Sequence, residues 1–175
     1  MRNWLGPLAF GLLVAVATGY AAIAAIPYGL MNVAVDRLGQ GGINRMAYGN
    51  LATPERQPVV RPSPDLAYST CPYDLSAGPL AVDVTPVPGR YSSLSIFDAA
   101  TDVIFVRNDV EAGGKPYRII LARGGQAVPK GAEVVRTNHD RGIALIRLLL
   151  KDPAEIGALD AARRQSSCAT VTKLK

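Results

Sequence analysis

The sequence has 175 residues, 49% of them hydrophobic, with 19 lysines and arginines against 14 aspartates and glutamates. This length is within the usual range for a single domain, and the net charge of +5 fits a domain held close to an anionic membrane surface. Nucleic acid is not an expected partner, because basic residues such as Arg90, Arg107 and Arg118 are scattered singly, with no basic run and no interleaved aromatic residues.

The first 38 residues predict a transmembrane anchor with a juxtamembrane helix. No charged side chain occurs from residue 3 to residue 35, and the run 4–25 is long enough, at about 1.5 Å per residue, to cross a hydrocarbon layer of about 30 Å. A cleaved signal peptide is the alternative, because Arg2 gives a minimal basic start and AAIAA resembles a cleavage site. We favour an uncleaved anchor, since the apolar run exceeds the usual signal core of about 7–15 residues.

Small residues recur at helical spacing within this span, at Gly11, Ala15 and Gly19. Such a stripe lets a second helix approach closely and predicts a docking surface for a partner helix, although an alanine-rich span also produces one by chance. The charges do not decide the orientation, because Arg2 and the terminal amine compete with Arg37 and Arg45 beyond the other end.

The segment after the span predicts a helical extension followed by a linker. YGLMNVAVDRLG continues the helix along the membrane interface, and the glycines of GQGG end it. Residues 39–64 are rich in glycine and proline, which predicts a stiff, extended spacer that lifts the domain off the bilayer. Residues 65–175 are then expected to form a periplasmic β-rich domain.

Period-two alternation predicts the strands of this domain. Leu80, Val82 and Val84 share one face, whereas Asp83 and Thr85 share the other. The segment GIALIRLLL also fits a short buried helix, and we favour a strand. Strands are expected at 80–84, 90–97, 103–108, 117–122, 132–137 and 142–150.

One helix is predicted in the soluble part, at 152–165. Asp152 can cap its first turn, and Pro153 suits the position that follows. The expected fold class is an N-terminal transmembrane helix plus a mainly-β (α+β) domain, an antiparallel sheet or sandwich with one C-terminal helix.

The two cysteines, Cys71 and Cys168, form no C-x-x-C pair and have no histidine near them in sequence, which argues against a metal or thioredoxin-like site. A disulfide between them is expected if the domain faces an oxidising compartment, and two unpaired buried thiols are the alternative. If formed, it would close a loop of roughly a hundred residues, which the chain-entropy model associates with about 4–5 kcal/mol.

Catalytic and cofactor-binding motifs are not recognisable, so no catalytic residue, metal or cofactor is predicted. His139, the sole histidine, fits a solvated loop residue better than a base. Asp98 and Asp102 fit turn positions better than an acid–base pair or a calcium site. The glycine-rich stretches lack the spacing of a phosphate-binding loop.

The segment from 62 to 91 contains the order D-x-x-Y, D-L-S-x-G-P and R-Y, which resembles the core of the bacterial domain-of-unknown-function family 1254 (DUF1254). The resemblance runs from about residue 59 to 165 and includes GIALIRLLL before a D-P-A-E helix. It rests on Asp65, Tyr68, Asp74, Leu75, Ser76, Gly78, Pro79, Arg90 and Tyr91.

This resemblance implies an exported or envelope-associated protein that is often encoded beside a companion family, DUF1214, or fused to it. The family usually opens the block with N-x-D-T-x-Y, whereas this chain has Ser63 and Leu66 at the asparagine and threonine positions; if that asparagine and threonine line a site, this chain has lost two of its polar groups. The resemblance supplies no catalytic residues. The prolines of 62–76 favour a rigid structural strap across the β core over an active-site loop.

Two functional hypotheses follow. The first is a single-pass inner-membrane protein, N-terminus in the cytoplasm and domain in the periplasm, that acts as a non-catalytic accessory or assembly subunit. Its expected partners are the lipid bilayer and other envelope proteins, with a DUF1214 protein as one candidate. The second is a membrane-tethered enzyme or binding domain for envelope lipid or glycan. Its polar cluster would consist of Asp65, Tyr68, Asp74 and Arg90.

Overall fold

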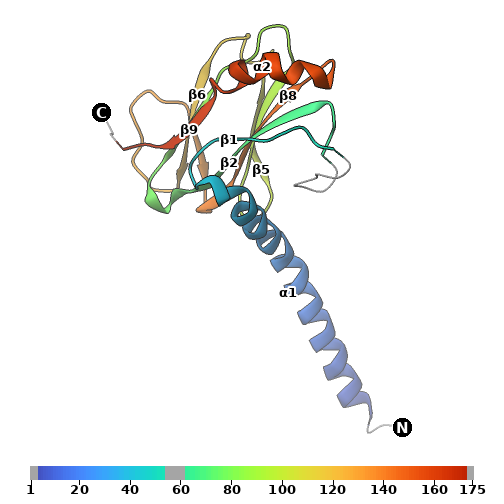
Figure 1. Cartoon of the computed structure of the whole chain (residues 1–175). Coiled ribbons are helices and arrows are strands. Elements are labelled where there is room, and N and C mark those ends of the chain that lie inside the picture. The colour runs from blue at the N-terminus through green and yellow to red at the C-terminus, as the bar shows by residue number, and fades with distance from the viewer. Residues whose placement is uncertain (1–3, 54–61, 173–175) are drawn as a thin grey trace.

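A computed structural model describes residues 4–53 and 62–172 of the chain. A long N-terminal helix leads into two β-sheets that pack face to face, with a short helix near the C-terminus (Figure 1). This is the sandwich-like α+β fold that the sequence predicts.

The helices are α1 (Leu5–Leu38) and α2 (Ile156–Arg163), and the 3₁₀ turns are η2 (Gly39–Gly41), η3 (Leu75–Ala77) and η4 (Pro153–Glu155). The strands are β1 (Ala47–Tyr48), β2 (Leu66–Asp74), β3 (Leu80–Val84), β4 (Ser92–Phe97), β5 (Val103–Asn108), β6 (Tyr117–Arg123), β7 (Val134–Thr137), β8 (Arg141–Leu149) and β9 (Ser167–Thr170).

The strands form a five-stranded sheet in the order β1-β2-β8-β4-β5 and a four-stranded sheet in the order β7-β6-β3-β9. All neighbours in the first sheet run antiparallel. In the second sheet β6 and β7 run parallel, which differs from the expected antiparallel arrangement, because the turn after β6 is followed by a crossover rather than a hairpin.

The core lies between the two sheets and follows from the alternation seen in the sequence. Leu80, Val82 and Val84 of β3 all point into it, as predicted, and Leu94 and Ile96 of β4 meet them from the other sheet. Fully buried aliphatic side chains of this kind contribute about 1.5–3 kcal/mol each, so this layer is the main source of stability.

The segment predicted as a strap is instead a strand near the middle of the larger sheet. β2 pairs with β8 over nine residues, and Pro72 sits inside it. A proline has no N–H to donate. The Pro72 carbonyl accepts from the Asn44 N–H, on the side of β2 that faces away from β8. The missing N–H of Pro72 falls on this same side, where the neighbouring strand β1 is short. The pairing with β8 is therefore complete.

The first part of the predicted linker packs on the domain instead of holding it away from the membrane. β1 pairs with β2, and the Asn44 side chain donates to the Asp74 carbonyl and accepts from the Asp74 N–H. Asn44 takes a left-handed backbone conformation with φ 58°, which asparagine tolerates well. Residues 54–61 of the linker lie outside the described residues.

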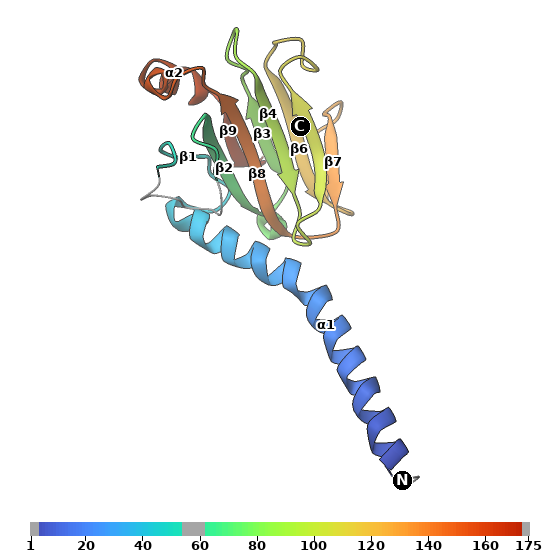
Figure 2. The ribbon, with the colours of Figure 1, turned by 90° about the vertical axis from the view of Figure 1, so that its right-hand side faces the viewer.

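Helix α1 continues through Pro27 and ends where the glycines begin, as the sequence predicts. A proline inside a helix removes one hydrogen bond and clashes with the preceding turn, which bends the helix. Figure 2 shows α1 changing direction between its free part and the part that runs along the sheet.

Asp152 and Pro153 start the C-terminal helical segment as expected. The Asp152 carboxylate accepts from the Ala154 N–H at 2.8 Å, and Pro153 follows at the first position. The segment ends with Arg163, which is buried and donates to the Tyr68 carbonyl at 3.3 Å. α2 is thereby fixed against β2.

Candidate functional site

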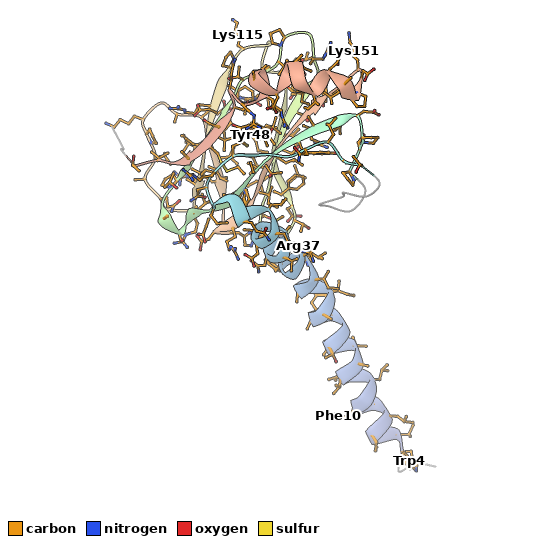
Figure 3. The ribbon with its side chains drawn as sticks, in the orientation of Figure 1. Trp4, Phe10, Arg37, Tyr48, Lys115 and Lys151 are labelled. Carbon is orange, nitrogen blue, oxygen red and sulfur yellow. A yellow bond between two sulfur atoms is a disulfide. The ribbon has the colours of Figure 1, made fainter. Side chains whose placement is uncertain are left out.

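The end of α1 is packed onto the outer face of the larger sheet. Residues of α1 up to Leu30 are exposed or, at Pro27, partly exposed, and burial begins with Met31 and Val35, which pack against Ile143 of β8. Figure 3 shows Trp4 at the free end of the helix and Arg37 where the helix meets the domain.

A charged residue reinforces this joint. Arg141, at the start of β8, donates to the Asn32 side chain at 3.0 Å and to the Asp36 carboxylate at 2.6 Å. Both acceptors lie on α1, whereas the arginine lies on the sheet, so these bonds link the two elements directly. The domain is thus held in one orientation relative to the last turns of the helix.

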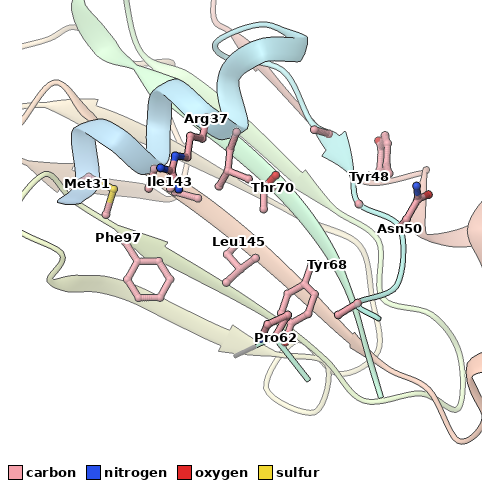
Figure 4. Close-up of a pocket in the computed structure, with 15 residues that line it drawn as sticks. Met31, Arg37, Tyr48, Asn50, Pro62, Tyr68, Thr70, Phe97, Ile143 and Leu145 are labelled. Atoms are coloured by element: carbon pink, nitrogen blue, oxygen red, sulfur yellow. The ribbon is translucent and has the colours of Figure 1, made fainter. Parts of the chain in front are cut away.

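A pocket of about 370 Å³ opens beside this joint. Its walls come from the end of α1, the segment around β1, and the outer face of β2, β8 and β4. Figure 4 shows Phe97, Leu145 and Tyr68 along the sheet, with Met31 and Arg37 on the helix. The lining is mainly apolar, and no aspartate or glutamate belongs to the described residues that form it. An apolar pocket of this size is within the usual range for a small-molecule site, about 300–1,000 Å³.

Contacts with the segment that follows α2 hold the β1 wall of the pocket in place. The Tyr48 hydroxyl donates to the Ser166 carbonyl at 2.5 Å, and the Arg164 guanidinium lies 4.7 Å from the centre of its ring. Burial raises the pKa of Tyr48, while Arg164 opposes that shift. Since both the ring and the hydroxyl have partners, this wall is built before any ligand arrives.

His139 and Asp98 form a second polar group beside Tyr28 of α1. His139 Nδ1 lies 2.9 Å from Asp98 Oδ2, and its ring meets the Tyr28 ring edge-on at 5.6 Å. His139 is thus partly buried and paired, which corrects its interpretation as a solvated loop residue. The Asp98 carboxylate also accepts from the N–H groups of Ala100 and Asp102, so it stabilises the turn before β5, as expected for a turn aspartate.

The four residues of the predicted polar cluster do not meet. Asp65 precedes β2 and Asp74 ends it, which puts them roughly 30 Å apart at about 3.3 Å per residue. Arg90 pairs with Glu155 at 2.6 Å. The Asp74 carboxylate accepts from the Ser76 N–H, and its pKa is lowered mainly by hydrogen bonding with the Ser76 side chain, with a smaller contribution from this backbone bond. Tyr68 alone among the four lines the pocket.

Cys71 and Cys168 are joined by a disulfide in the structure. Cys71 lies on β2 and Cys168 on β9, so the bond links the two sheets through the core. Their Cα atoms are 6.5 Å apart, and 97 residues separate them in sequence. The long apolar helix, which is a signal sequence or an anchor, and this disulfide together indicate an extracytoplasmic location.

The stripe of Gly11, Ala15 and Gly19 lies on the free part of α1. No other residue of the described chain comes within 4 Å of a Cβ built on either glycine, and Ala15 is exposed. Within residues 4–53 and 62–172, no group of three or more His, Cys, Asp or Glu side chains gathers where it could bind a metal.

Sequence reasoning missed the pocket because its walls come from segments far apart in the chain. Met31, Tyr48, Tyr68, Phe97 and Leu145 share a wall only after β2 and β8 pair and α1 docks across them. The sequence signal for it is the second face of β8, where Ile143 and Leu145 are apolar although the strand already supplies core residues from its first face.

Comparison with known proteins identifies the family and finds solved structures that are similar. Residues 43–170 match the family model described as "Protein of unknown function (DUF1254)". No curated protein matches the chain.

Two solved structures are similar. One is the VPA0106 protein from Vibrio parahaemolyticus, with a TM-score of 0.56 and 20% identity, over 62% of this chain and 28% of that one. The other is an uncharacterized protein from Burkholderia cenocepacia, with a TM-score of 0.48 and 16% identity, over 66% of this chain and 34% of that one. This chain thus matches about a third or less of the length of each, and at these identities the likeness concerns the fold alone. Because the family model covers most of the chain, from the end of α1 to β9, the chain belongs to the DUF1254 family.

Proposed function

We propose that this is a single-pass inner-membrane protein with its N-terminus in the cytoplasm and its DUF1254 domain in the periplasm, where it works by contact as an accessory or assembly subunit of an envelope complex. The length of α1 supports the anchor, since the apolar run 4–25 is long enough to cross a bilayer. The disulfide supports the periplasmic side, because such bonds persist in oxidising compartments.

The observation that carries the proposal is the fixed joint between α1 and the sheet. Val35 is fully buried there, and Arg141 bonds to Asp36 across the joint. A freely linked domain would meet other proteins in any orientation. A domain held at one angle to its anchor presents the same surface to every protein embedded beside it, which suits a subunit that works by contact.

The free part of α1 offers a place for the partner. Gly11, Ala15 and Gly19 face outward, and small residues at this spacing allow a second transmembrane helix to approach closely. The companion DUF1214 family is one candidate source of that helix, because the two families are often encoded together.

Protease protection tests the topology. Trypsin added to spheroplasts should degrade the domain while the inner membrane stays closed, and a cytoplasmic marker should survive. A domain that is protected until the membrane is opened would contradict the periplasmic orientation. Release of the domain into the soluble periplasmic fraction, without α1, would show that α1 is a cleaved signal sequence.

Affinity purification from gently solubilised membranes tests the partner. We expect a stoichiometric membrane protein to accompany the wild-type chain and to be lost from Gly11→Leu. Gly6→Leu is the matched control, because Gly6 is also on the free part of α1 but points to a different side. Purification of the wild-type chain without a stoichiometric companion would contradict the accessory role.

A second candidate function is a membrane-tethered binding domain for an envelope lipid. The apolar pocket beside the joint favours it, since a lipid chain suits apolar walls better than a glycan does.

A further inference from the structure

The pocket lies at the level where α1 leaves the membrane. Residues 5–26 of the helix span about 33 Å at about 1.5 Å per residue, which matches a hydrocarbon layer of about 30 Å. Met31, the first residue of α1 that lines the pocket, is five residues further along, about 7 Å above the end of that span. The head-group layer extends about 5–7 Å beyond the hydrocarbon on each side. The lower lip of the pocket therefore reaches the head groups.

The walls of the pocket suit an alkyl chain. Met31 and Leu38 of α1 face Phe97, Ile143 and Leu145 of the sheet. Buried apolar area contributes about 25 cal/mol per Å², so each methylene group that leaves water for these walls contributes about 0.8 kcal/mol. Every methylene group of an alkyl chain therefore adds binding free energy. A polar ligand would lose its bound water and find few hydrogen-bond partners on these walls in return.

The charges around the pocket select for an acidic head group. Arg37 lines the pocket at its exposed rim, and Arg147 follows Leu145 on the same face of β8. Neither arginine forms an ion pair with a carboxylate in the described parts of the chain. Arg147 donates to the Ser95 hydroxyl at 2.9 Å, and its Nε is buried without a hydrogen-bond partner.

Neighbouring carboxylates do not cancel this charge. Asp36, next to Arg37 in sequence, is bonded to Arg141 at 2.6 Å, and no acidic side chain belongs to the described lining. Arg37 is therefore the charged side chain among the described residues that line this apolar interior. An anionic head group therefore gains more electrostatic binding free energy here than a zwitterionic or a cationic one.

We propose that the pocket binds one acyl chain of an anionic phospholipid lifted partly out of the outer leaflet of the inner membrane, with the acidic head group at Arg37, about 16 Å beyond the end of the span at about 1.5 Å per residue, and the chain running down toward Met31. The bilayer is the source, because the pocket opens at head-group level beside a helix that is itself embedded. This inference rests on the proposed anchoring of α1, but not on the accessory role or on any protein partner.

Photo-cross-linking of the full chain in nanodiscs tests this proposal. The probe is phosphatidylglycerol with a diazirine on one acyl chain, diluted into phosphatidylcholine. We expect labelled peptides from β8 and from residues 31–38 of α1, in addition to ordinary lipid contacts along residues 5–30. Leu145→Trp fills the pocket and should reduce the pocket label at least fivefold. Leu149→Trp is the control, because Leu149 lies on the same face of β8 outside the pocket.

A second variant that fills the pocket from another element controls for misfolding of the first. Ala34→Phe enters the pocket from α1 and should have the same effect as Leu145→Trp. The Cys71–Cys168 disulfide, seen as a mobility shift on reduction, reports that each variant has folded. Equal pocket label in the filled variants and in Leu149→Trp would overturn the proposal.

The head-group preference is tested separately. Arg37→Gln should reduce the preference for phosphatidylglycerol over a phosphatidylcholine probe by about fivefold, while Arg45→Gln, an exposed arginine outside the pocket, should leave it unchanged. A diazirine fatty acid supplied to the same nanodiscs distinguishes a phospholipid from a free fatty acid as the occupant. Pocket label from the free fatty acid but not from the phospholipid would refute the phospholipid.

The outcomes also separate this inference from the anchoring on which it rests. Label along residues 5–30 without label in the pocket would refute pocket binding and leave the anchor intact. Failure of the full chain to enter nanodiscs, with no label on α1, would refute the anchor itself.

Discussion

Arg141 at the start of β8 donates to the carboxylate of Asp36 in the last turns of α1, with 2.6 Å between nitrogen and oxygen. The Asp36 side chain is 67% exposed, so water screens the pair and its contribution to stability is in the usual range for surface ion pairs, about 0–1 kcal/mol. Burial of Val35 and Met31 supplies the larger part of the docking energy. The ion pair sets the register of the helix on the sheet.

Shortening Val35 should therefore weaken the joint more than removing the charge. Val35→Ala is expected to cost about 2 kcal/mol of docking free energy, because Val35 is fully buried, whereas Asp36→Asn should cost less than about 1 kcal/mol. Hydrogen exchange of the amides from 31 to 38 measures both. Val33→Ala, at an exposed position of the same helix, is the control. Equal protection in the two valine variants would contradict the observed packing.

Loss of the disulfide should lower stability strongly. The bond closes a loop with a sequence separation of 97, for which the chain-entropy model gives about 4–5 kcal/mol. Cys71→Ala/Cys168→Ala should unfold at clearly lower denaturant than the oxidised wild type when both are measured as solubilised full chains. Addition of reductant should bring the wild type close to the variant and leave the variant unchanged. A wild type that is insensitive to reductant would show that the bond does not hold the sheets together.

Gly142 should not tolerate any side chain. A Cβ at this position would lie 2.1 Å from the Phe97 carbonyl oxygen and 2.4 Å from the Tyr73 hydroxyl, and these two atoms are themselves hydrogen-bonded at 2.9 Å. Gly142→Ala is expected to destabilise the domain by more than about 2 kcal/mol, because backbone must move or the buried bond must break.

Gly157→Ala provides the matched control for that substitution. Gly157 lies in α2 with nothing within 4 Å of a built Cβ, so alanine there should stabilise the helix by up to about 1 kcal/mol. Thermal unfolding of both variants measures the contrast. A Gly142→Ala protein as stable as the wild type would show that the contact around Tyr73 is looser than described.

The pairing of Asp160 should produce a loss of stability in acid. Hydrogen bonds from Arg164 and Arg163 lower the pKa of Asp160 in the folded chain. A carboxyl group with a lowered folded pKa stabilises the fold above its unfolded pKa of about 4, and this contribution disappears as the pH falls through the folded value.

Denaturation midpoints between pH 5.5 and pH 2.5 measure this effect. Asp160→Asn should be less stable than the wild type at pH 5.5 and equal to it at the lowest pH. Asp65→Asn is the control, because the Asp65 carboxylate is exposed and has no hydrogen-bond partner in the described parts of the chain. A gap between Asp160→Asn and the wild type that persists unchanged in acid would rule out the ion pairs as its cause.

Local patterns in the sequence were enough to predict several helices and strands. The uncharged apolar run predicted α1, the alternation of Leu80, Val82 and Val84 predicted a half-buried strand, and Asp152 before Pro153 predicted the start of the last helix. Each of these signals is a period or a cap read within a few residues, and the physical forces behind it act over the same short range. The family was also recognisable, because its motifs lie in one continuous stretch.

The neighbours of those helices and strands, in contrast, follow from the tertiary structure. Pro72 belongs to the segment predicted as a strap, and this segment forms β2 because the missing N–H of Pro72 falls on the side away from β8. Tyr68 and Leu145 line one pocket because β2 pairs with β8, and Met31 joins them because α1 docks across both strands. These contacts depend on strand order and helix docking, which residues distant in sequence set together, and so the apolar second face of β8 is a local sign of one wall but not of the assembled site.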